Sequence, residues 1–203
     1  MNGEQLQQHD RFLIEQLVRP IVNLYRITPL ASGETPAGGP VAFVRQKRMA
    51  FREDIRFFAD EGETQELFRI KARRVIDIGG RYDVHDAAGQ PIGVLEHQFR
   101  KSLLRSTWRI LSPSDEELAV AKEKNAFLAV ARRLVDFLPY GEWVPIPYDF
   151  VIHAGERELG HFTRKFLSVR DRYTLDLSGD TDKRVDRRLG IALGIGLDAL
   201  QNR

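Results

Sequence analysis

The chain has 203 residues, 42% of them hydrophobic and 30% charged, which is the balance of an ordinary globular domain with one core. Its 31 basic and 29 acidic side chains leave a formal net charge of +2, too close to balance for a nucleic-acid-binding chain, so we expect no nucleic-acid partner. The absence of cysteine excludes disulfides, thiolate nucleophiles and cysteine-ligated metals. It also favours a reducing compartment, so we expect a cytoplasmic protein.

The first forty residues are predicted to form an arm outside the main domain. Residues 9–26 have apolar side chains at helical spacing, which predicts an amphipathic helix kinked at Pro20. The segment TPLASGETPAGGP (28–40) is rich in Pro, Gly and small residues and is predicted to be a linker. Three roles are open for the helix: packing on the domain, forming a homo-oligomer, or lying on a membrane surface.

From Val41 onward the sequence changes to short segments typical of β-strands. In LFRIKARRVIDI (67–78), an apolar set alternates with Arg69, Lys71 and Arg73, which predicts a strand with one buried face and one basic face. Further strands are predicted within 41–51, 54–60, 81–86, 91–98, 103–111, 146–154, 157–166 and 171–177. Residues 114–138 interrupt this pattern: Ser114 and Glu117 form a capping box before an apolar stripe that stops at Pro139, which predicts a helix.

Two segments of the chain resemble each other. YDVHDAAGQPIGVLEHQFRK (from Tyr82) and YDFVIHAGERELGHFTRK (from Tyr148) each contain a strand, a Gly-containing turn, a second strand with a glycine, and a basic pair. Two copies indicate two halves of one β unit, because a solenoid needs three or more repeats.

The C-terminal segment RLGIALGIGLDAL is apolar around its whole helical circumference. Between Leu189 and Leu200 it has 12 residues, or about 18 Å of helix, which is too short for a hydrocarbon core of about 30 Å. A helix of this kind must be buried on all sides, so we expect residues 182–200 to fill the centre of a closed β-barrel. Asp180 and Thr181 are the expected N-cap.

The order and spacing of these segments resemble the tubby C-terminal-like superfamily, and most of all its phospholipid scramblase and LURP-one-related branch. The matching segments are FVRQKRMAF (43–51), YDVHDAAGQPIG (82–93), STWRIL (106–111), RYTLDL (172–177) and the C-terminal helix. The resemblance implies a mainly β (α+β) fold over 41–203: a closed antiparallel barrel of roughly 12 strands around the helix. The two helices at 9–26 and 114–138 would lie outside it.

The resemblance also implies a non-catalytic lipid- or ligand-binding barrel, because tubby-type members bind phosphoinositides through basic side chains. The candidate headgroup ligands here are Arg69, Lys71, Arg73, Arg74, Arg100, Lys101, Arg164 and Lys165. They predict binding to anionic phospholipid by a protein that is peripheral at the membrane. The opposing interpretation is a solvated strand face, with neighbouring acidic residues as partners.

No cofactor and no catalytic residue are expected. Scramblases are linked to calcium, and Asp176, Asp180 and Asp182 form the weak calcium candidate here, but the segment does not fit an EF-hand because position 12 is Arg187. Hydrolase, nucleotide-binding and dinucleotide-binding motifs are absent from the sequence. The alternative function is a protein-interaction module that uses the helices at 9–26 and 114–138.

Overall fold

A computed structural model describes residues 3–18, 22–47, 54–73, 80–98, 106–124, 149–165 and 172–201. A 3₁₀-helix, η1 (Gly3–Gln8), comes first, and the chain closes with the helix α2 (Arg187–Gln201). The strands between them are β1 (Arg11–Val18), β2 (Val22–Pro29), β3 (Ala42–Lys47), β4 (Asp54–Phe58), β5 (Glu66–Ala72), β6 (Arg81–Asp86), β7 (Pro91–His97), β8 (Thr107–Leu111), β9 (Glu117–Glu123), β10 (Asp149–Ala154), β11 (Arg157–Lys165) and β12 (Arg172–Asp176).

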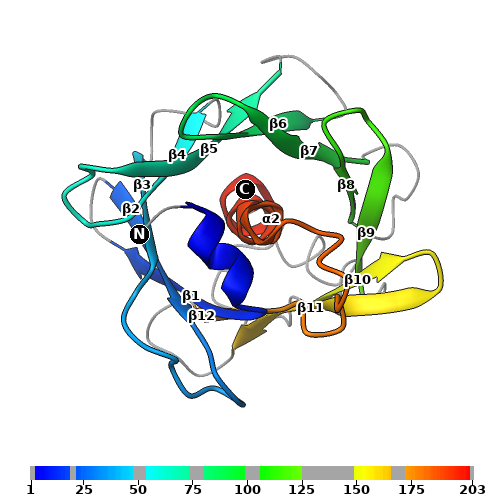
Figure 1. The fold of residues 1–203 in the computed structure, drawn as a ribbon, viewed down its shortest axis with the longest axis horizontal. Helices are drawn as coiled ribbons and strands as arrows, with labels where there is room; N and C mark the ends of the chain where they lie inside the picture. The colour runs from blue at the N-terminus through cyan, green and yellow to red at the C-terminus, as the bar shows by residue number, and fades with distance from the viewer. Residues whose placement is uncertain are drawn as a thin grey trace, which may run out of the picture.

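These strands form one closed barrel in which each strand pairs antiparallel with its neighbour in the sequence, and β12 pairs with β1 to close the wall. The helix α2 runs through the centre and is seen nearly end-on in Figure 1. Every residue from Leu189 to Leu197 is buried, as its all-round apolar character requires. The prediction of a mainly β barrel closed around a C-terminal helix is therefore confirmed.

The start of α2 differs from the prediction. The N-cap is Asp186, whose Oδ1 accepts the backbone N–H of Arg188 at 2.8 Å. Asp180 instead fixes the preceding loop, where its carboxylate accepts the N–H groups of Arg184 and Val185 at 3.0 Å each. The expected cap at Asp180 or Thr181 was wrong because the chain makes one further turn before the helix begins.

The predicted helix at 9–26 is not present, because the structure has β1 and β2 there. Phe12, Ile14 and Gln16 alternate into the interior, while Leu13 and Leu17 on the outer face are partly exposed. When both faces of a strand carry apolar residues, the alternation of apolar and polar positions is lost, and the remaining spacing also fits the apolar stripe of a helix. The local sequence therefore predicted a helix where the structure has strands. Pro20 lies outside the described residues.

Residues 11–18 and 22–29 are consequently part of the barrel wall and not of an arm outside it. The strand β1 lies between β12 and β2, and β2 lies between β1 and β3. The predicted linker begins as the last residues of β2, and only its later part, residues 31–40, is an exposed connection.

The predicted helix at 114–138 is also wrong in its described part. Glu117 begins β9, which pairs with β8 and β10. Ser114 belongs to the β8–β9 turn, where the Ser112 hydroxyl accepts the N–H groups of Ser114 and Glu116 at 3.2 and 3.1 Å. Residues 125–148 lie outside the described part of the chain.

The sequence repeat corresponds to two hairpins, β6–β7 and β10–β11. Gly93 lies opposite Val84 and Gly160 lies opposite Ile152, and each pair directly precedes a bulge. The glycines are required by close packing: a Cβ on Gly160 would lie 1.8 Å from the Asp176 carbonyl oxygen.

We expect Gly160→Ala to destabilise the fold by about 3 kcal/mol or more, because backbone at that distance yields only if β11 and β12 separate. Chemical denaturation followed by circular dichroism measures this loss. The matched control is Gly39→Ala, whose Cβ would meet no atom within 4 Å and whose effect we expect to be within about 0.5 kcal/mol. Equal stability of the two variants would contradict the observed strand packing.

The described connections between strands lie at one end of the barrel. At this end, turns join β4 to β5, β6 to β7, β8 to β9 and β10 to β11, the longer connection 30–41 joins β2 to β3, and residues 177–186 lead from β12 into α2. The helix η1 lies across this end and buries Leu6 completely (Figure 1). The strands β1, β3, β5, β7, β9 and β11 finish at the other end, toward which α2 runs.

Candidate functional site

Acidic residues predominate in the connections at one end of the barrel. The connections at the end where α2 begins contain ten acidic residues: Glu34, Asp60, Glu61, Glu63, Asp115, Glu116, Glu156, Asp180, Asp182 and Asp186. They contain two basic residues, Lys183 and Arg184, so these connections carry a net charge of −8. Since the whole chain has 31 basic and 29 acidic residues, its other residues comprise 29 basic and 19 acidic ones, or +10.

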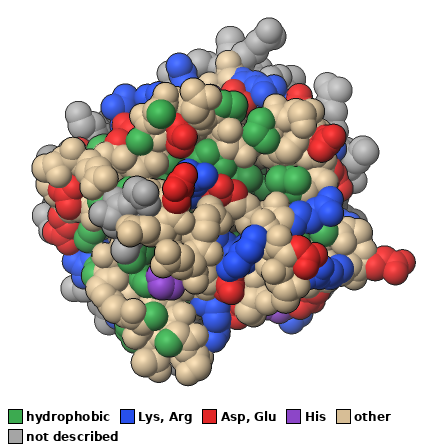
Figure 2. Space-filling model, in the orientation of Figure 1, with side chains coloured by type: hydrophobic (Ala, Val, Ile, Leu, Met, Phe, Trp, Pro, Cys, Tyr) green, Lys and Arg blue, Asp and Glu red, His purple; other side chains and the backbone are tan. Residues whose placement is uncertain are grey.

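This acidic end faces the viewer in Figure 2, where acidic side chains are seen around the rim with basic side chains among them. At its centre, Arg187 is fully buried and pairs with Asp180 at 2.7 Å. The same guanidinium reaches Asp10 at 2.5 Å, and Lys183 also pairs with Asp10. Burial by itself would raise the pKa of Asp10, but the hydrogen bonds from Lys183 and Arg187 together hold it below its ordinary value.

The predicted basic face of β5 lies on the outside of the barrel. Arg69 approaches Glu66 at 3.8 Å, and the Nε–H of Arg73 donates to both carboxylate oxygens of Asp83, at 2.8 and 2.9 Å. The hydrogen bond to Asp83 raises the pKa of Arg73. Lys71 is exposed and makes no ion pair within the described part of the chain. The alternation of β5 was therefore predicted correctly, and Glu66 was among the acidic partners expected for a solvated face; Asp83 on β6 depended on the pairing register.

The other predicted basic residues do not gather with these three in the described structure. Arg74, Arg100 and Lys101 lie outside the described residues, as does the side chain of Lys165. Arg164 shares the inward register of Phe162 and is partly buried, so it does not belong to the outer surface. In the sequence, Arg74 follows β5, Arg100 and Lys101 follow β7, and Arg164 and Lys165 end β11. These three strands all finish at the same end of the barrel.

The structure does not bring the calcium candidates together. Each of the three carboxylates has its own arginine: Asp176 pairs with Arg11 at 2.9 Å, Asp180 with Arg187 at 2.7 Å, and Asp182 with Arg157 at 2.6 Å. Across the residues that the structure describes, no three His, Asp or Glu side chains form a group able to hold a metal ion. The arginine partners come from β1, β11 and α2, so the sequence pattern alone did not reveal them.

Comparison with known families gives one result. The model of the LURP-one-related (LOR) family matches residues 41–198. The chain belongs to the LURP-one-related family. This family is part of the tubby-like superfamily, so the resemblance seen in the sequence is confirmed. No match was found among curated proteins or among solved structures.

The region matched by the family model is shorter than the fold of this LURP-one-related domain. The match begins at residue 41, whereas the wall of the barrel begins at Arg11.

None of the helices in the described residues has both the length and the apolar character needed to cross a bilayer.

Proposed function

We propose that this LURP-one-related domain is a non-catalytic barrel that binds anionic phospholipid headgroups as a peripheral protein on the cytoplasmic side of a membrane. The observation that carries the proposal is the acidic end of the barrel, where the described connections carry −8, which leaves +10 for the other residues of the sequence. An anionic leaflet attracts basic side chains by about 1 kcal/mol each and repels acidic ones, so the acidic end points away from the membrane.

The basic face of β5 supports this orientation. Arg69 and Lys71 point outward on β5, and the exposed Arg73 directly follows its last residue, toward the end opposite the acidic turns. Alternate residues on one strand face lie about 6.6–7 Å apart, which allows neighbouring cations to contact one headgroup or adjacent headgroups. Their carboxylate partners are at the surface, where an ion pair contributes only about 0–1 kcal/mol, so a phosphate replaces them at little cost.

We expect the protein to sediment with vesicles that contain phosphatidylserine and not with phosphatidylcholine vesicles, and 0.5 M NaCl should release it. Neutralising the β5 face with Arg69→Gln, Lys71→Gln and Arg73→Gln should weaken this partitioning roughly a hundredfold, at about 1 kcal/mol per charge. Co-sedimentation over a lipid titration measures the change.

The matched control carries the same change in net charge at the acidic end, in Arg157→Gln, Lys183→Gln and Arg184→Gln. All three side chains are exposed, and we expect their loss to leave vesicle binding within about threefold of the original. Equal binding to neutral and anionic vesicles, or equal losses in both triple variants, would rule out a membrane-facing basic surface on β5.

The sequence also suggested a protein-interaction module built on helices at 9–26 and 114–138. The structure removes the basis of that version in the residues it describes, because β1, β2 and β9 form the wall of the barrel there.

A further inference from the structure

The outer face of β1–β4 has a hollow with an apolar floor, about 70 Å³ in volume, which we call the outer pocket. Its floor contains Leu17, Leu24, Phe43 and Phe58. The register explains their convergence: Leu17 lies directly opposite Leu24, and Phe43 lies directly opposite Phe58, on consecutive strands of the wall. Four apolar side chains thus meet on the outer surface of the barrel.

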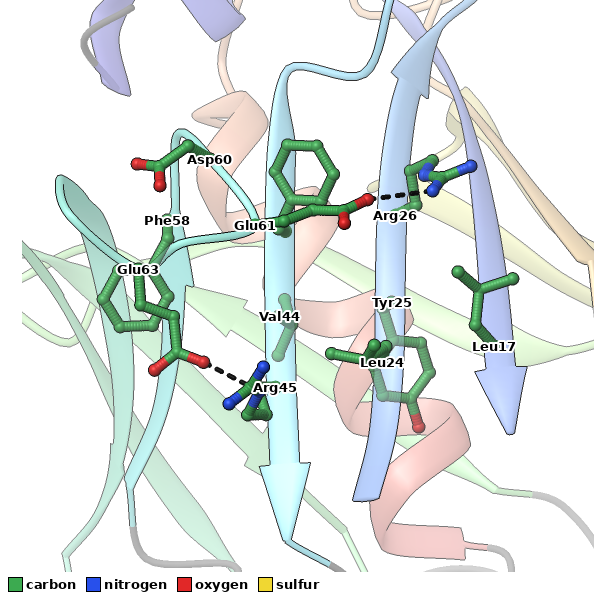
Figure 3. Close-up of a pocket in the computed structure, with 11 residues that line it drawn as sticks. Leu17, Leu24, Tyr25, Arg26, Val44, Arg45, Phe58, Asp60, Glu61 and Glu63 are labelled. Carbon is green, nitrogen blue, oxygen red and sulfur yellow. Dashed lines mark hydrogen bonds and ion pairs between the residues drawn. The ribbon is translucent and has the colours of Figure 1, made fainter. Parts of the chain in front are cut away.

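The turn between β4 and β5 forms the rim of the outer pocket (Figure 3). Glu61 and Glu63 extend from this turn to Arg26 and Arg45, and the two ion pairs measure 2.9 Å each. The Glu61 side chain is 61% exposed and Arg45 is 48% exposed. Ion pairs this open to water contribute about 0–1 kcal/mol, so a cation from outside can replace the arginines as partner of the carboxylates.

The rim has an excess of negative charge, because it carries three carboxylates and two guanidinium groups. The third carboxylate, Asp60, binds the Thr64 hydroxyl at 2.8 Å and the N–H groups of Thr64 and Gln65, and within the described residues it has no basic partner. The hydrogen bond from the Thr64 side chain, with those from the backbone, lowers the pKa of Asp60, so the carboxyl stays ionised. The floor adds two phenylalanine rings, whose faces attract cations.

We propose that the outer pocket is a docking site for a segment of a partner protein in which an aliphatic or aromatic side chain stands next to a lysine or arginine. The apolar side chain covers the floor, and the cation contacts Asp60 and its neighbours on the rim. The volume favours a side chain over a free small molecule, because pockets that enclose small molecules measure about 300–1,000 Å³. The excess negative charge opposes an anionic lipid at the same place.

The test uses the full ¹⁵N-labelled chain and three acetylated and amidated pentapeptides: Gly-Lys-Leu-Lys-Gly, Gly-Lys-Ser-Lys-Gly and Gly-Glu-Leu-Glu-Gly. We expect only the first to shift backbone amide signals of β2, β3 and the β4–β5 turn in a saturable way. Asp60→Asn and Leu24→Ser should each weaken this binding about fivefold or more, one through charge and one through the floor. Glu156→Gln, which removes an exposed acid on another turn, should leave it unchanged.

Equal shifts with all three peptides, shifts elsewhere on the barrel, or a preference for the acidic peptide would overturn the docking proposal. Melting curves check that each variant is folded. If Asp60→Asn disturbs the β4–β5 turn, Leu24→Ser still tests the proposal through the floor of the outer pocket. Phosphatidylserine vesicles should not displace the bound peptide, and displacement would reassign the outer pocket to lipid. The β5 vesicle experiment involves other residues, so either proposal can fail without the other.

Discussion

A chain that begins at residue 41, where the family match begins, is expected not to fold. Removing residues 1–40 deletes β1 and β2 and takes Phe12, Ile14, Tyr25 and Ile27 out of the core, where each is at most 1% exposed. At about 1.5–3 kcal/mol for each buried side chain, the loss is roughly 6–12 kcal/mol, which matches the whole stability of a typical domain. The deletion would also leave β3 and β12 as open edges, which promote aggregation.

Expression of residues 41–203 should therefore give insoluble protein or a chain without a cooperative melting transition. The control is the full chain cut once by a protease within the exposed connection 31–40. Its two fragments should stay together and melt cooperatively, because β1 and β2 remain paired with β12 and β3. A soluble 41–203 protein with native near-ultraviolet circular dichroism would show that β1 and β2 are dispensable.

The second large effect is expected at the buried ion pair beside the start of α2. Arg187 is fully buried, Asp180 is 1% exposed, and the guanidinium also donates to the Val185 carbonyl at 2.8 Å. Arg187→Leu leaves the carboxylate of Asp180 buried without its counter-ion, so we expect a loss of about 3–5 kcal/mol in the free energy of unfolding.

A double-mutant cycle tests this origin of the effect. Asp180→Ala should cost a similar amount, and the double variant should cost clearly less than the sum of the two, because no charge is then left unpaired. Asp182→Ala is the matched control: its side chain is 69% exposed, and we expect less than about 1 kcal/mol. Strict additivity of the two buried substitutions would show that the pair does not act as a unit.

The strands whose two faces differ in polarity were the ones that could be predicted from sequence. In β5, apolar Phe68 and Ile70 alternate with basic Arg69 and Lys71, and the structure places them inside and outside as expected. In β1 and β2 the outer face carries Leu17 and Leu24, so the period-two pattern was lost and a helical stripe fitted equally well. The same outward leucines form part of the outer pocket. The outward apolar side chains therefore prevented both the two strands and this site from being predicted.

Partners of charged side chains were beyond local prediction for a related reason. The hydrogen bond between Arg73 and Asp83, and the ion pair between Arg187 and Asp10, join residues from different elements. Which residues meet depends on the strand register and on how far the loop before α2 extends, and neither is fixed by neighbours in the sequence. For the same reason the three calcium candidates lie apart, and each of them pairs with an arginine from another part of the chain.

The burial of the C-terminal helix inside a closed wall was predictable from the amino-acid sequence alone, because a short helix that is apolar all round has no other stable environment in water. The inward and outward faces of β5 were predictable as well, through alternation within one strand. The three-dimensional structure was needed to show that the wall begins at Arg11, that the connections at one end are acidic, and that the outer pocket exists. These features arise from contacts between residues far apart in the chain, and such contacts are set by closure of the barrel and not by local periodicity.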